Sequence, residues 1–436
     1  MSDAICVDVG STFTKGLRVD LDSGAVLGSA ARPTTVATDV LTGLYAVVAD
    51  LGASAAAPLL VCSSAGGGLR LAVVGFEESV TALAGYRAGL SAGARVVHVN
   101  AGRLTGADVA ALRAARPDVI LLVGGTDGGN ADVLRHNASR LANARVAMPV
   151  VLAGNADARV ECVEILTRTR RTVVPADNVL PRIGEIAPES ARAAIRSVFL
   201  THVIGGKKLS RGPEFAGLVR RATPDAVLQG VEVLAAATGR DALVVDIGGA
   251  TTDVYSALIP SGEDVEIVRD VSPTPRVART VEADLGMRWS AGGVLDAAER
   301  ERLPVTDDLR PYAESVANDI AHLPTSPAEW KCELELARLA AVIAVRRHAR
   351  PVRPGQAPRA LRDVGRVMGS GGVLRHADPA AAREILGALL TDHGGGWPVP
   401  DRAVAGVDTA YVLFAAGLLA QEHPRAAAAL TCSLTH

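Results

Sequence analysis

Two short segments of this sequence combine an aspartate, glycine and hydroxyl side chains in nearly the same order. The first runs from Asp8 to Lys15 and reads DVGSTFTK, and the second runs from Asp246 to Asp253 and reads DIGGATTD. Glycine lets backbone N–H groups turn toward an anion without a Cβ in the way, and Ser and Thr hydroxyls add further donors. Each segment therefore predicts a tight hairpin that binds phosphate.

The aspartates that open the two segments, Asp8 and Asp246, are candidate ligands of a metal ion. If the two hairpins grip one polyphosphate from both sides, these carboxylates approach the same point and repel each other unless a cation lies between them. Mg²⁺, held partly through water, suits that arrangement. Lys15 is one of only four lysines among 45 basic residues. A compact ammonium group that reaches the phosphates would explain why arginine has not replaced it.

A third glycine-rich segment, Gly369-Ser370-Gly371-Gly372, follows an apolar stretch and opens a predicted helix. A glycine turn between a strand and a helix N-terminus is a common setting for contacts with a nucleotide. One Asp-x-Gly-x-Thr segment alone is more often an ordinary β-turn. Two matching segments and a third glycine loop in one chain predict a nucleotide site.

The elements that must position the two hairpins recur in the same order. Strands are predicted at 4–8, 13–21, 26–31 and 59–63 with a helix at 39–51, and again at 243–246, 253–258 and 265–270. Residues 278–421 are predicted to be mostly helical, with one more strand at 366–368. An internal duplication is the simplest account of this recurrence.

Between the two copies, residues 94–176 alternate strand and helix. Strands are predicted at 96–99, 119–123, 150–153 and 172–175, and helices at 106–115, 130–144 and 156–169. This alternation is typical of a small doubly wound sheet. The loop Gly124–Gly129 has two interpretations. It contacts a phosphate, a cobalamin tail or a partner protein, or it is a plain glycine-rich turn.

We therefore predict an α/β fold with two duplicated halves that flank a nucleotide cleft and an inserted doubly wound α/β subdomain. The predicted divisions are the first half at 1–90, the insert at 91–200, a return to the first half with a connector at 201–240, and the second half at 241–436. Aromatic residues are only 3% of the chain, so the core must come from aliphatic side chains, as it does where helices cover parallel strands.

Composition excludes several classes of protein. A formal net charge of −2 argues against a dedicated partner of nucleic acid or of an anionic membrane. No run of about 18 apolar residues suggests a membrane span, and the N-terminus does not resemble a signal peptide. The five cysteines lie far apart, which favours neither a disulfide framework nor a zinc site. The expected location is the cytoplasm, and the oligomeric state is not indicated.

The three loops resemble the phosphate-1, phosphate-2 and adenosine motifs of the actin-like ATPase (ASKHA) superfamily, whose two halves are RNase H-like. The resemblance implies that Asp8 and Asp246 hold the hydration shell of Mg²⁺ and that Asp253 orders the attacking water. It also implies contacts of the nucleotide with Gly10, Ser11, Thr12, Lys15, Gly248, Gly249, Thr251, Thr252, Gly369, Ser370, Gly371 and Gly372. Glu282, on a helix predicted after the second hairpin, would contact the ribose. Helices at 223–235 and 408–419 would connect the halves.

Over essentially its whole length the chain resembles the glutamate mutase accessory protein family (MutL/GlmL). The resemblance rests on Phe13–Lys15, Leu122–Asn130, Val151–Asn155, Asp246–Val254, Arg279–Gly286 and Gly369–Arg375. It implies an ATPase that reactivates or protects adenosylcobalamin-dependent mutases, with mutase subunits as partners. Mismatch-repair MutL shares only the name and has a different ATPase fold. The Asp-x-His-x-x-Gly motif that ligates cobalt is absent here.

The leading hypothesis is thus an ATP- and Mg²⁺-dependent accessory factor for an adenosylcobalamin-dependent mutase. Two alternatives stay open on the same fold. One is a small-molecule kinase, which needs an acceptor pocket beside the terminal phosphate. The other is a scaffold that binds nucleotide, holds a mutase subunit and hydrolyses little.

Overall fold

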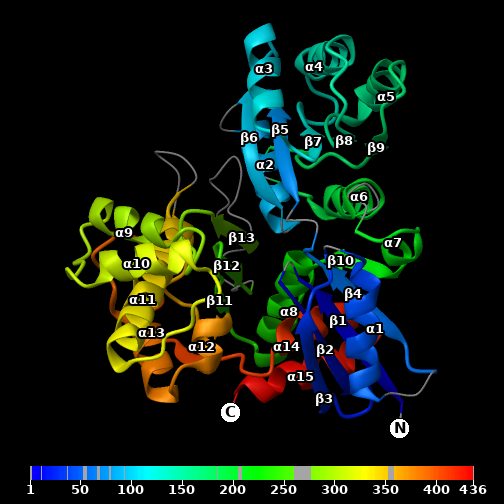
Figure 1. The fold of residues 1–436 in the computed structure, drawn as a ribbon. Coiled ribbons are helices and arrows are strands. Elements are labelled where there is room, and N and C mark those ends of the chain that lie inside the picture. The colour runs from blue at the N-terminus through cyan, green and yellow to red at the C-terminus, as the bar shows by residue number, and fades with distance from the viewer. Residues whose placement is uncertain are drawn as a thin grey trace. The chain divides into compact units, whose positions relative to one another are not determined.

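The computed structural model describes residues 2–10, 12–36, 38–52, 56–65, 69–77, 80–92, 94–183, 185–204, 209–259, 276–351 and 358–435 (Figure 1). The chain forms two compact units, which are described separately. Unit 1 contains residues 1–229, 260–278 and 417–426, and unit 2 contains residues 230–259, 279–416 and 427–436.

Unit 1 begins with a five-stranded sheet in the order β10-β4-β1-β2-β3. Its strands are β1 (Asp3–Val9), β2 (Phe13–Asp20), β3 (Val26–Pro33), β4 (Leu59–Ser63) and β10 (Val219–Ala222). The first three form an antiparallel meander, whereas β4 is parallel to β1 and β10 is parallel to β4. The strands and the helix that were predicted for residues 4–63 are therefore confirmed.

Helix α1 (Val40–Leu51) packs on this sheet through Val40, Leu44 and Val47, which are fully buried. Asp39 caps its N-terminus by accepting a hydrogen bond from the Leu41 N–H at 2.9 Å. The helix approaches β2 so closely that a Cβ on Gly16 would lie 2.5 Å from Val47 Cγ1. Glycine at this position therefore sets the distance between helix and sheet.

Unit 2 contains a second five-stranded sheet, in the order β13-β12-β11-β14-β15. Its strands are β11 (Ala242–Ile247), β12 (Thr252–Ala257), β13 (Val277–Glu282), β14 (Arg366–Ser370) and β15 (Val404–Val407). Numbered within each copy, both sheets have the order 3-2-1-4-5, with the last two strands parallel to the first. This repetition is the duplicated α/β architecture expected from the sequence.

Most of the helices of unit 2 pack on its sheet or on the long helix that covers the sheet. They are α9 (Ala291–Arg300), α10 (Leu309–Asn318), α11 (Pro327–Ala349), α12 (Gly372–His376) and α13 (Pro379–Thr391). The long α11 packs against β11 and β12, and Leu336, Ala340 and Ile343 lie with Val245 in one buried cluster. Ser326 and Glu329 form a capping box at its start.

Two expectations about the second copy were wrong. The segment with Arg279 and Glu282, predicted to be helical, is the strand β13, because it pairs with β12 as the third strand of the meander. β15 was missed within a region predicted to be mostly helical. The third strand expected at 265–270 lies outside the described residues.

The remaining part of unit 1 is a parallel sheet in the order β6-β5-β7-β8-β9. Its strands are β5 (Arg70–Gly75), β6 (Arg95–Ala101), β7 (Val119–Leu122), β8 (Val150–Leu152) and β9 (Val173–Pro175). The order 2-1-3-4-5 is that of a doubly wound sheet, as predicted for the insert. The sheet already includes β5, about 20 residues before the boundary predicted at residue 91.

Helices cover both faces of this parallel sheet. They are α2 (Thr81–Ser91), α3 (Gly106–Ala114), α4 (Asp132–Asn143), α5 (Arg159–Thr167) and α6 (Glu189–Val198). Leu71 and Val73 share a buried cluster with residues of α2 and α6, whereas Ala72 and Val74 share another with residues of α3, α4 and α5. Successive side chains of β5 therefore point to opposite faces of the sheet, and helices bury both faces.

The chain passes between the units within α8 (Thr223–Thr238) and α14 (Val412–Leu419), and also between residues 259 and 260, within β13 and within α15 (Pro424–Cys432). Helices α8 and α14 correspond to the predicted connectors, although α14 starts later than expected. A Cβ on Gly230 of α8 would lie 2.0 Å from the Leu413 carbonyl oxygen, so only glycine fits there. A further helix is α7 (Glu214–Leu218). Within the described ranges, no helix is both long enough and apolar enough to traverse a bilayer.

Candidate functional site

The first predicted hairpin joins β1 to β2. The Gly10 N–H donates to the Phe13 carbonyl at 3.0 Å, and Asp8 lies directly opposite Lys15 in the antiparallel register. A Cβ on Gly10 would lie 2.7 Å from the Phe13 carbonyl oxygen, so the turn requires glycine there. Thr12 is exposed, which leaves it accessible to a ligand, whereas Ser11 lies outside the described residues.

Asp8 is almost completely buried, with 3% of its surface exposed. Its Oδ1 accepts a hydrogen bond from the Thr223 hydroxyl at the start of α8 and a weak one from Cys62 Sγ at 3.6 Å. Burial raises the pKa of Asp8, and the Thr223 hydrogen bond and the charge of Lys15 oppose that rise. Thr223 was named only as part of a connector, because its contact with Asp8 spans 215 positions.

The second predicted hairpin, between β11 and β12, has the same geometry. The Gly248 N–H donates to the Thr251 carbonyl at 2.9 Å, and Asp246 lies directly opposite Asp253. Gly249 is exposed and Thr251 is half-buried, so the outer part of this turn is accessible.

Thr252 differs from its neighbour Thr251. It is fully buried, and its hydroxyl donates to the Leu285 carbonyl at 2.5 Å. In this arrangement the hydroxyl supports the hairpin from within. Residues 286–289 support the same turn, since the N–H groups of Met287 and Arg288 donate to the carbonyls of Gly248 and Gly249 at 3.0 and 2.8 Å.

Asp253 lies in a buried polar cluster of unit 2. Its Oδ2 accepts from Arg279 Nη2 at 2.8 Å and from the Tyr255 hydroxyl at 3.4 Å. Its Oδ1 is buried and has no hydrogen-bond partner among the described residues. Arg279 lies 5.6 Å from the centre of the Tyr255 ring. One carboxylate oxygen is thus fixed by the protein, and the other is left for a ligand or water.

The third loop lies beside the second hairpin. β14 is parallel to β11, and Ser370 pairs with Asp246. Gly371 has a φ of 99°, and a Cβ there would lie 2.1 Å from the Ile247 carbonyl oxygen, so only glycine permits this approach. Gly369 is less tightly constrained, since its Cβ would lie 2.6 Å from Leu374 Cδ1, the end of a side chain. The exposed Gly372 opens α12.

Asp408, which sequence reasoning placed only in a connector, lies at the end of β15 next to this loop. Its N–H donates to the Gly369 carbonyl at 2.9 Å, and its carboxylate accepts from the N–H groups of Val412 and Leu413 at 2.9 and 3.1 Å. Burial raises the pKa of Asp408, and these hydrogen bonds oppose the rise. Asp408 therefore ties the third loop to α14.

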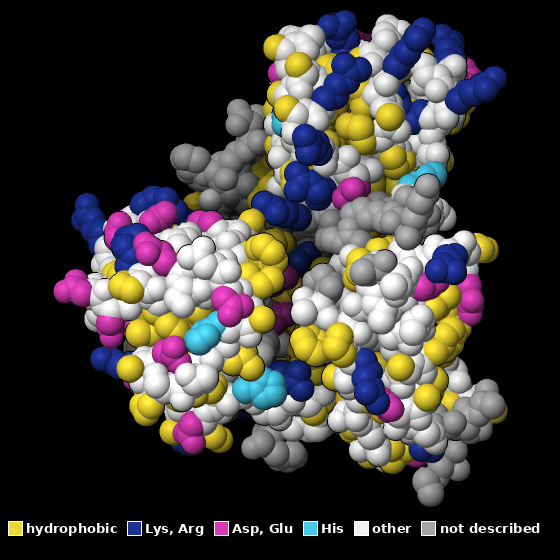
Figure 2. All heavy atoms as spheres, viewed as in Figure 1, with side chains coloured by type: hydrophobic (Ala, Val, Ile, Leu, Met, Phe, Trp, Pro, Cys, Tyr) yellow, Lys and Arg dark blue, Asp and Glu magenta, His cyan; other side chains and the backbone are white. Residues whose placement is uncertain are grey.

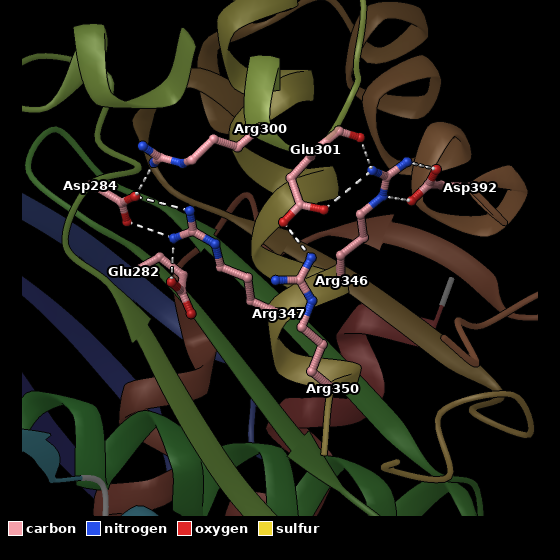
Figure 3. Close-up of polar contacts among 8 residues, drawn as sticks. All are labelled: Glu282, Asp284, Arg300, Glu301, Arg346, Arg347, Arg350 and Asp392. Carbon is pink, nitrogen blue, oxygen red and sulfur yellow. Dashed lines mark hydrogen bonds and ion pairs between the residues drawn. The ribbon is translucent and has the colours of Figure 1, made fainter. Parts of the chain in front are cut away.

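Glu282 belongs to a network of charged side chains (Figure 3). Its Oε2 lies 2.7 Å from Arg347 Nη1, and the same guanidinium group bonds Asp284 at 2.7 and 3.0 Å. Burial raises the pKa of Glu282, and Arg347 opposes that rise. A second, separate group is formed by the neighbouring residue of α11, Arg346, which bonds Asp392 at 2.6 Å. Glu282 is thus held by α11, and its contact with a ribose remains a prediction.

In the insert, the Gly124–Gly129 loop is held by protein groups. Asn178 Nδ2 donates to the Gly125 carbonyl at 3.0 Å and to Asp127 Oδ1 at 2.9 Å, and Asn155 Nδ2 donates to the Gly129 carbonyl at 2.9 Å. Gly125 has a φ of 71°, and its Cβ would lie 2.3 Å from the Asn130 carbonyl oxygen. These contacts favour the interpretation as a structural turn.

The structure thus gathers the predicted site residues into two groups. Asp8 and Lys15 lie together in unit 1 with Gly10 and Thr12, and Asp246 and Asp253 lie together in unit 2. The residues of unit 2 also include Gly248, Gly249, Thr251, Ser370 and Gly371. Because the two groups belong to different units, a metal ion shared by Asp8 and Asp246 remains a prediction.

Comparison with known proteins identifies the family. The profile of the family described as "MutL protein" matches residues 4–434. The chain belongs to the MutL family. One member, Protein MutL from Clostridium tetanomorphum, is 33% identical to it over 450 residues, which cover 97% of each chain.

Solved structures give more distant matches. The ATP-dependent caprolactamase from Pseudomonas jessenii is 14% identical, with a TM-score of 0.40 over 95% of this chain and 70% of that one. The activator of 2-hydroxyisocaproyl-CoA dehydratase from Clostridium difficile, solved with bound ADPNP, is 10% identical, with a TM-score of 0.32 over 97% and 95%. The architecture of this MutL-family chain rests on its own repeated sheet order.

Proposed function

We propose that this MutL-family chain is a Mg²⁺-dependent ATPase that serves as an accessory or reactivating factor for an adenosylcobalamin-dependent mutase of the glutamate mutase or aminomutase type. The repeated hairpin carries the ATPase part of the proposal. Asp8 and Asp246 occupy equivalent positions, two residues before a glycine whose N–H closes the turn at 3.0 and 2.9 Å. The partner part rests on membership of the family.

The residues around the hairpins suit a nucleotide. Gly10, Thr12, Gly248, Gly249 and Thr251 offer backbone N–H groups and hydroxyls on turns that phosphate oxygens can approach. Lys15 adds a positive charge beside the first turn. Gly371 and Gly372 leave backbone without side chains next to the second turn, where the proposal places adenosine.

The residues also suit Mg²⁺. Burial of the Asp8 carboxylate disfavours its charged form, and a nearby cation would favour that form. Asp246 and Asp253 lie directly opposite each other, and like charges in that position are unfavourable unless they are neutralised. In the proposal Asp8 and Asp246 hold the hydrated ion, which would offset the negative charge of the phosphates when bound.

Asp253 is the proposed acceptor for the water that attacks the terminal phosphate. Arg279 fixes Oδ2, so the buried Oδ1 keeps a defined direction and has no protein donor among the described residues. A water molecule bound there would have its proton held and oriented by the carboxylate. Thr223 fixes Asp8 as Arg279 fixes Asp253, because the Thr223 hydroxyl donates a hydrogen bond to Asp8 Oδ1.

In the proposed cycle, each unit contributes one hairpin to the nucleotide, and binding and hydrolysis alter the positions of the two units. The chain passes between them within α8 and α14, and Gly230 brings these helices into close contact in unit 2. Such a pair of helices suits a hinge that transmits a rigid-body movement to a bound mutase.

The test measures ATP binding and turnover by the purified chain at millimolar Mg²⁺, with Asp8→Asn, Lys15→Ala and Asp246→Asn as variants. We expect slow hydrolysis that all three variants reduce, and recovery of an inactivated mutase that depends on that hydrolysis. Absence of ATP affinity in the wild type would contradict the proposal. Rapid phosphate transfer to an added acid or sugar would indicate a kinase instead, and tight binding without turnover would indicate a scaffold.

A further inference from the structure

Three helices of the insert end in the same uncommon way. Arg116, Arg145 and Arg170 follow α3, α4 and α5 with φ values of 44°, 50° and 55°, which lie in the left-handed region. In each case the arginine N–H donates to the carbonyl three residues earlier, at 3.0, 2.9 and 2.9 Å. Glycine usually occupies such positions because it alone adopts this conformation without a penalty from Cβ.

The three arginines lie along one edge of the insert. They precede β7, β8 and β9, which are parallel neighbours in the sheet, so the amino ends of these strands lie side by side. Hydrogen bonds connect the same loops. Arg113 at the end of α3 donates to the Ala144 carbonyl, and Arg171 donates to the Leu141 and Val146 carbonyls at 2.9 and 2.8 Å.

The arginines of this edge fall into two groups with different roles. Arg70, Arg113 and Arg171 donate to carbonyl groups at the ends of α3 and α4, which stabilises the fold. Arg116, Arg145 and Arg170 are exposed, and their guanidinium groups make no hydrogen bond or ion pair with the described residues. The second group is therefore available to another molecule.

Charge is distributed unevenly between the two ends of the same strands. Asp127, Asp157 and Asp177 follow β7, β8 and β9, and each is bound within the protein: to Ala156 N–H at 2.9 Å, to Gly128 N–H at 2.9 Å and to Arg159 at 3.2 Å. At the arginine edge, Asp118 accepts from the Arg70 N–H at 2.9 Å, and Glu164 lies one turn before the end of α5. Figure 2 shows Lys and Arg side chains gathered over the region of α3, α4 and α5.

We infer that Arg116, Arg145 and Arg170 form a docking surface for an acidic protein, called here the arginine edge. Each arginine has a backbone conformation that glycine would adopt more easily. Backbone preference alone would therefore favour glycine, but the chain has a positively charged side chain at all three positions. Exposed guanidinium groups in a row match a row of carboxylates, which they bind in a bidentate manner. A hollow of about 370 Å³ between α4 and α5 is lined by Glu161 and Glu164 as well as Arg168, so the acidic partner is assigned to the arginines and not to this hollow.

An acidic protein fits better than nucleic acid. The chain as a whole has a formal net charge of −2, whereas proteins that bind nucleic acid carry a strong excess of positive charge. Among the residues that the structure describes, no exposed aromatic side chain lies beside Arg116, Arg145 and Arg170 to stack on a base. The inference concerns a surface on the insert and does not depend on ATP binding at the two hairpins.

The experiment uses the full chain and a fluorescein-labelled decaglutamate peptide, with binding followed by anisotropy at about 20 mM salt, where charge–charge contacts are least screened. The triple variant R116G/R145G/R170G should bind the peptide about tenfold more weakly, since three exposed charge pairs are lost. Its thermal midpoint should stay the same or rise, because glycine relieves the left-handed backbone. The triple Arg→Lys variant, which keeps the charge, should retain most of the binding.

Unit 2 offers a matched control. Arg302 follows α9 with a φ of 57°, is exposed, and its N–H donates to the Glu299 carbonyl at 3.1 Å, so it repeats the geometry outside the insert. Arg302→Gly should leave the thermal midpoint unchanged or raise it, as the glycine triple does. It should leave peptide binding unchanged. If the glycine triple lowers the midpoint, the triple Arg→Asn variant replaces it, because asparagine tolerates the left-handed region.

Three outcomes would overturn the inference. The wild type fails to bind the peptide, the glycine triple binds as the wild type does, or Arg302→Gly weakens binding as much as the triple. A ten-nucleotide single-stranded DNA is the competing probe. If it binds more tightly than the peptide and the triple variant abolishes that binding, the partner is a nucleic acid and the assignment of an acidic protein is wrong.

Discussion

The two hairpins share a backbone but differ in the side chain that faces the leading aspartate. In the first hairpin Asp8 lies opposite Lys15, and in the second Asp246 lies opposite Asp253. The turns close with nearly identical hydrogen bonds of 3.0 and 2.9 Å. Duplication therefore preserved the geometry that presents backbone N–H groups while the charge at one equivalent position was reversed. In the proposed function, one copy would offer a cation to phosphate and the other a carboxylate to water.

The surroundings of Lys15 and Asp253 also differ in charge. Lys15 is half-buried and lies across from a buried carboxylate of opposite charge. Asp253 lies across from a carboxylate of like charge, and it accepts hydrogen bonds from Arg279 on the neighbouring strand β13 and from Tyr255 on its own strand β12. The second hairpin needs this additional support because two carboxylates on facing strands repel each other. The comparison thus predicts that the second hairpin is more sensitive to the loss of a neighbour.

Loss of Arg279 should have the largest effect. Arg279 is 5% exposed, and its removal leaves Asp253 buried and facing Asp246 without its partner. Arg279→Met should lower the free energy of unfolding by about 3–5 kcal/mol, measured by urea denaturation. Adding Asp253→Asn should restore much of the loss, because the uncompensated charge is then gone. Equal losses in the single and double variants would show that the pair is not coupled.

Replacement of Asp253 should lower ATP turnover without weakening ATP binding. Asp253→Asn keeps the shape of the side chain but weakens its ability to accept a proton from water. ATP turnover should fall at least about 100-fold, and the dissociation constant for ATP should change by less than about threefold. Single-turnover measurements with calorimetric titration would check both values. A parallel loss of affinity would instead give Asp253 a role in holding the nucleotide.

The hairpins were predictable from the sequence because their information is local. Glycine at positions 10 and 248 is demanded by contacts with residues only three positions away, and the residues before each glycine form the short apolar run of a buried strand. Their repetition at a fixed separation then indicated duplication. The order of the parallel strands in the insert followed from alternation of strand and helix in the same way.

The supporting residues were not predictable because their contacts are distant in sequence. Thr223 reaches Asp8 across 215 positions, and Arg279 reaches Asp253 only because β13 is the strand next to β12. The β-branched residues Val277, Thr280 and Val281 favour a strand, and the expectation of a helix overlooked them. Asp408 was hidden for the same reason, since β15 is short and was missed.

Loss of the cation in the first hairpin should have a smaller effect than loss of Arg279. Lys15 is half-buried, so Lys15→Met should leave the free energy of unfolding within about 1 kcal/mol. Affinity for ATP should fall about tenfold, which corresponds to about 1.4 kcal/mol. Lys15→Arg is the matched control that keeps the charge. If the methionine variant binds ATP as the wild type does, the reversal of charge between the hairpins has no role in phosphate binding.

The smallest effect expected is a dependence of stability on pH that belongs to Asp8. Because burial raises the pKa of Asp8 in the folded chain, the folded state binds this proton more tightly than the unfolded state. The associated stability is fully present below the unfolded pKa and is lost as pH rises through the folded value. Asp8→Asn, which cannot ionise and still accepts from Thr223, should therefore raise the thermal midpoint at pH 7 without nucleotide.

That gain should shrink as the pH falls through the raised pKa of Asp8 in the folded chain, and it should be gone below about 4, the ordinary aspartate value, where the unfolded chain is protonated as well. Thr223→Val serves as the control, because it removes the hydrogen bond and leaves the charge, and it should lower the midpoint at pH 7. A midpoint for Asp8→Asn that is below that of the wild type at every pH would mean that the charged carboxylate stabilises the fold. The first hairpin would then need a neutralising partner stronger than Lys15, and it would resemble the second hairpin more closely than its contacts indicate.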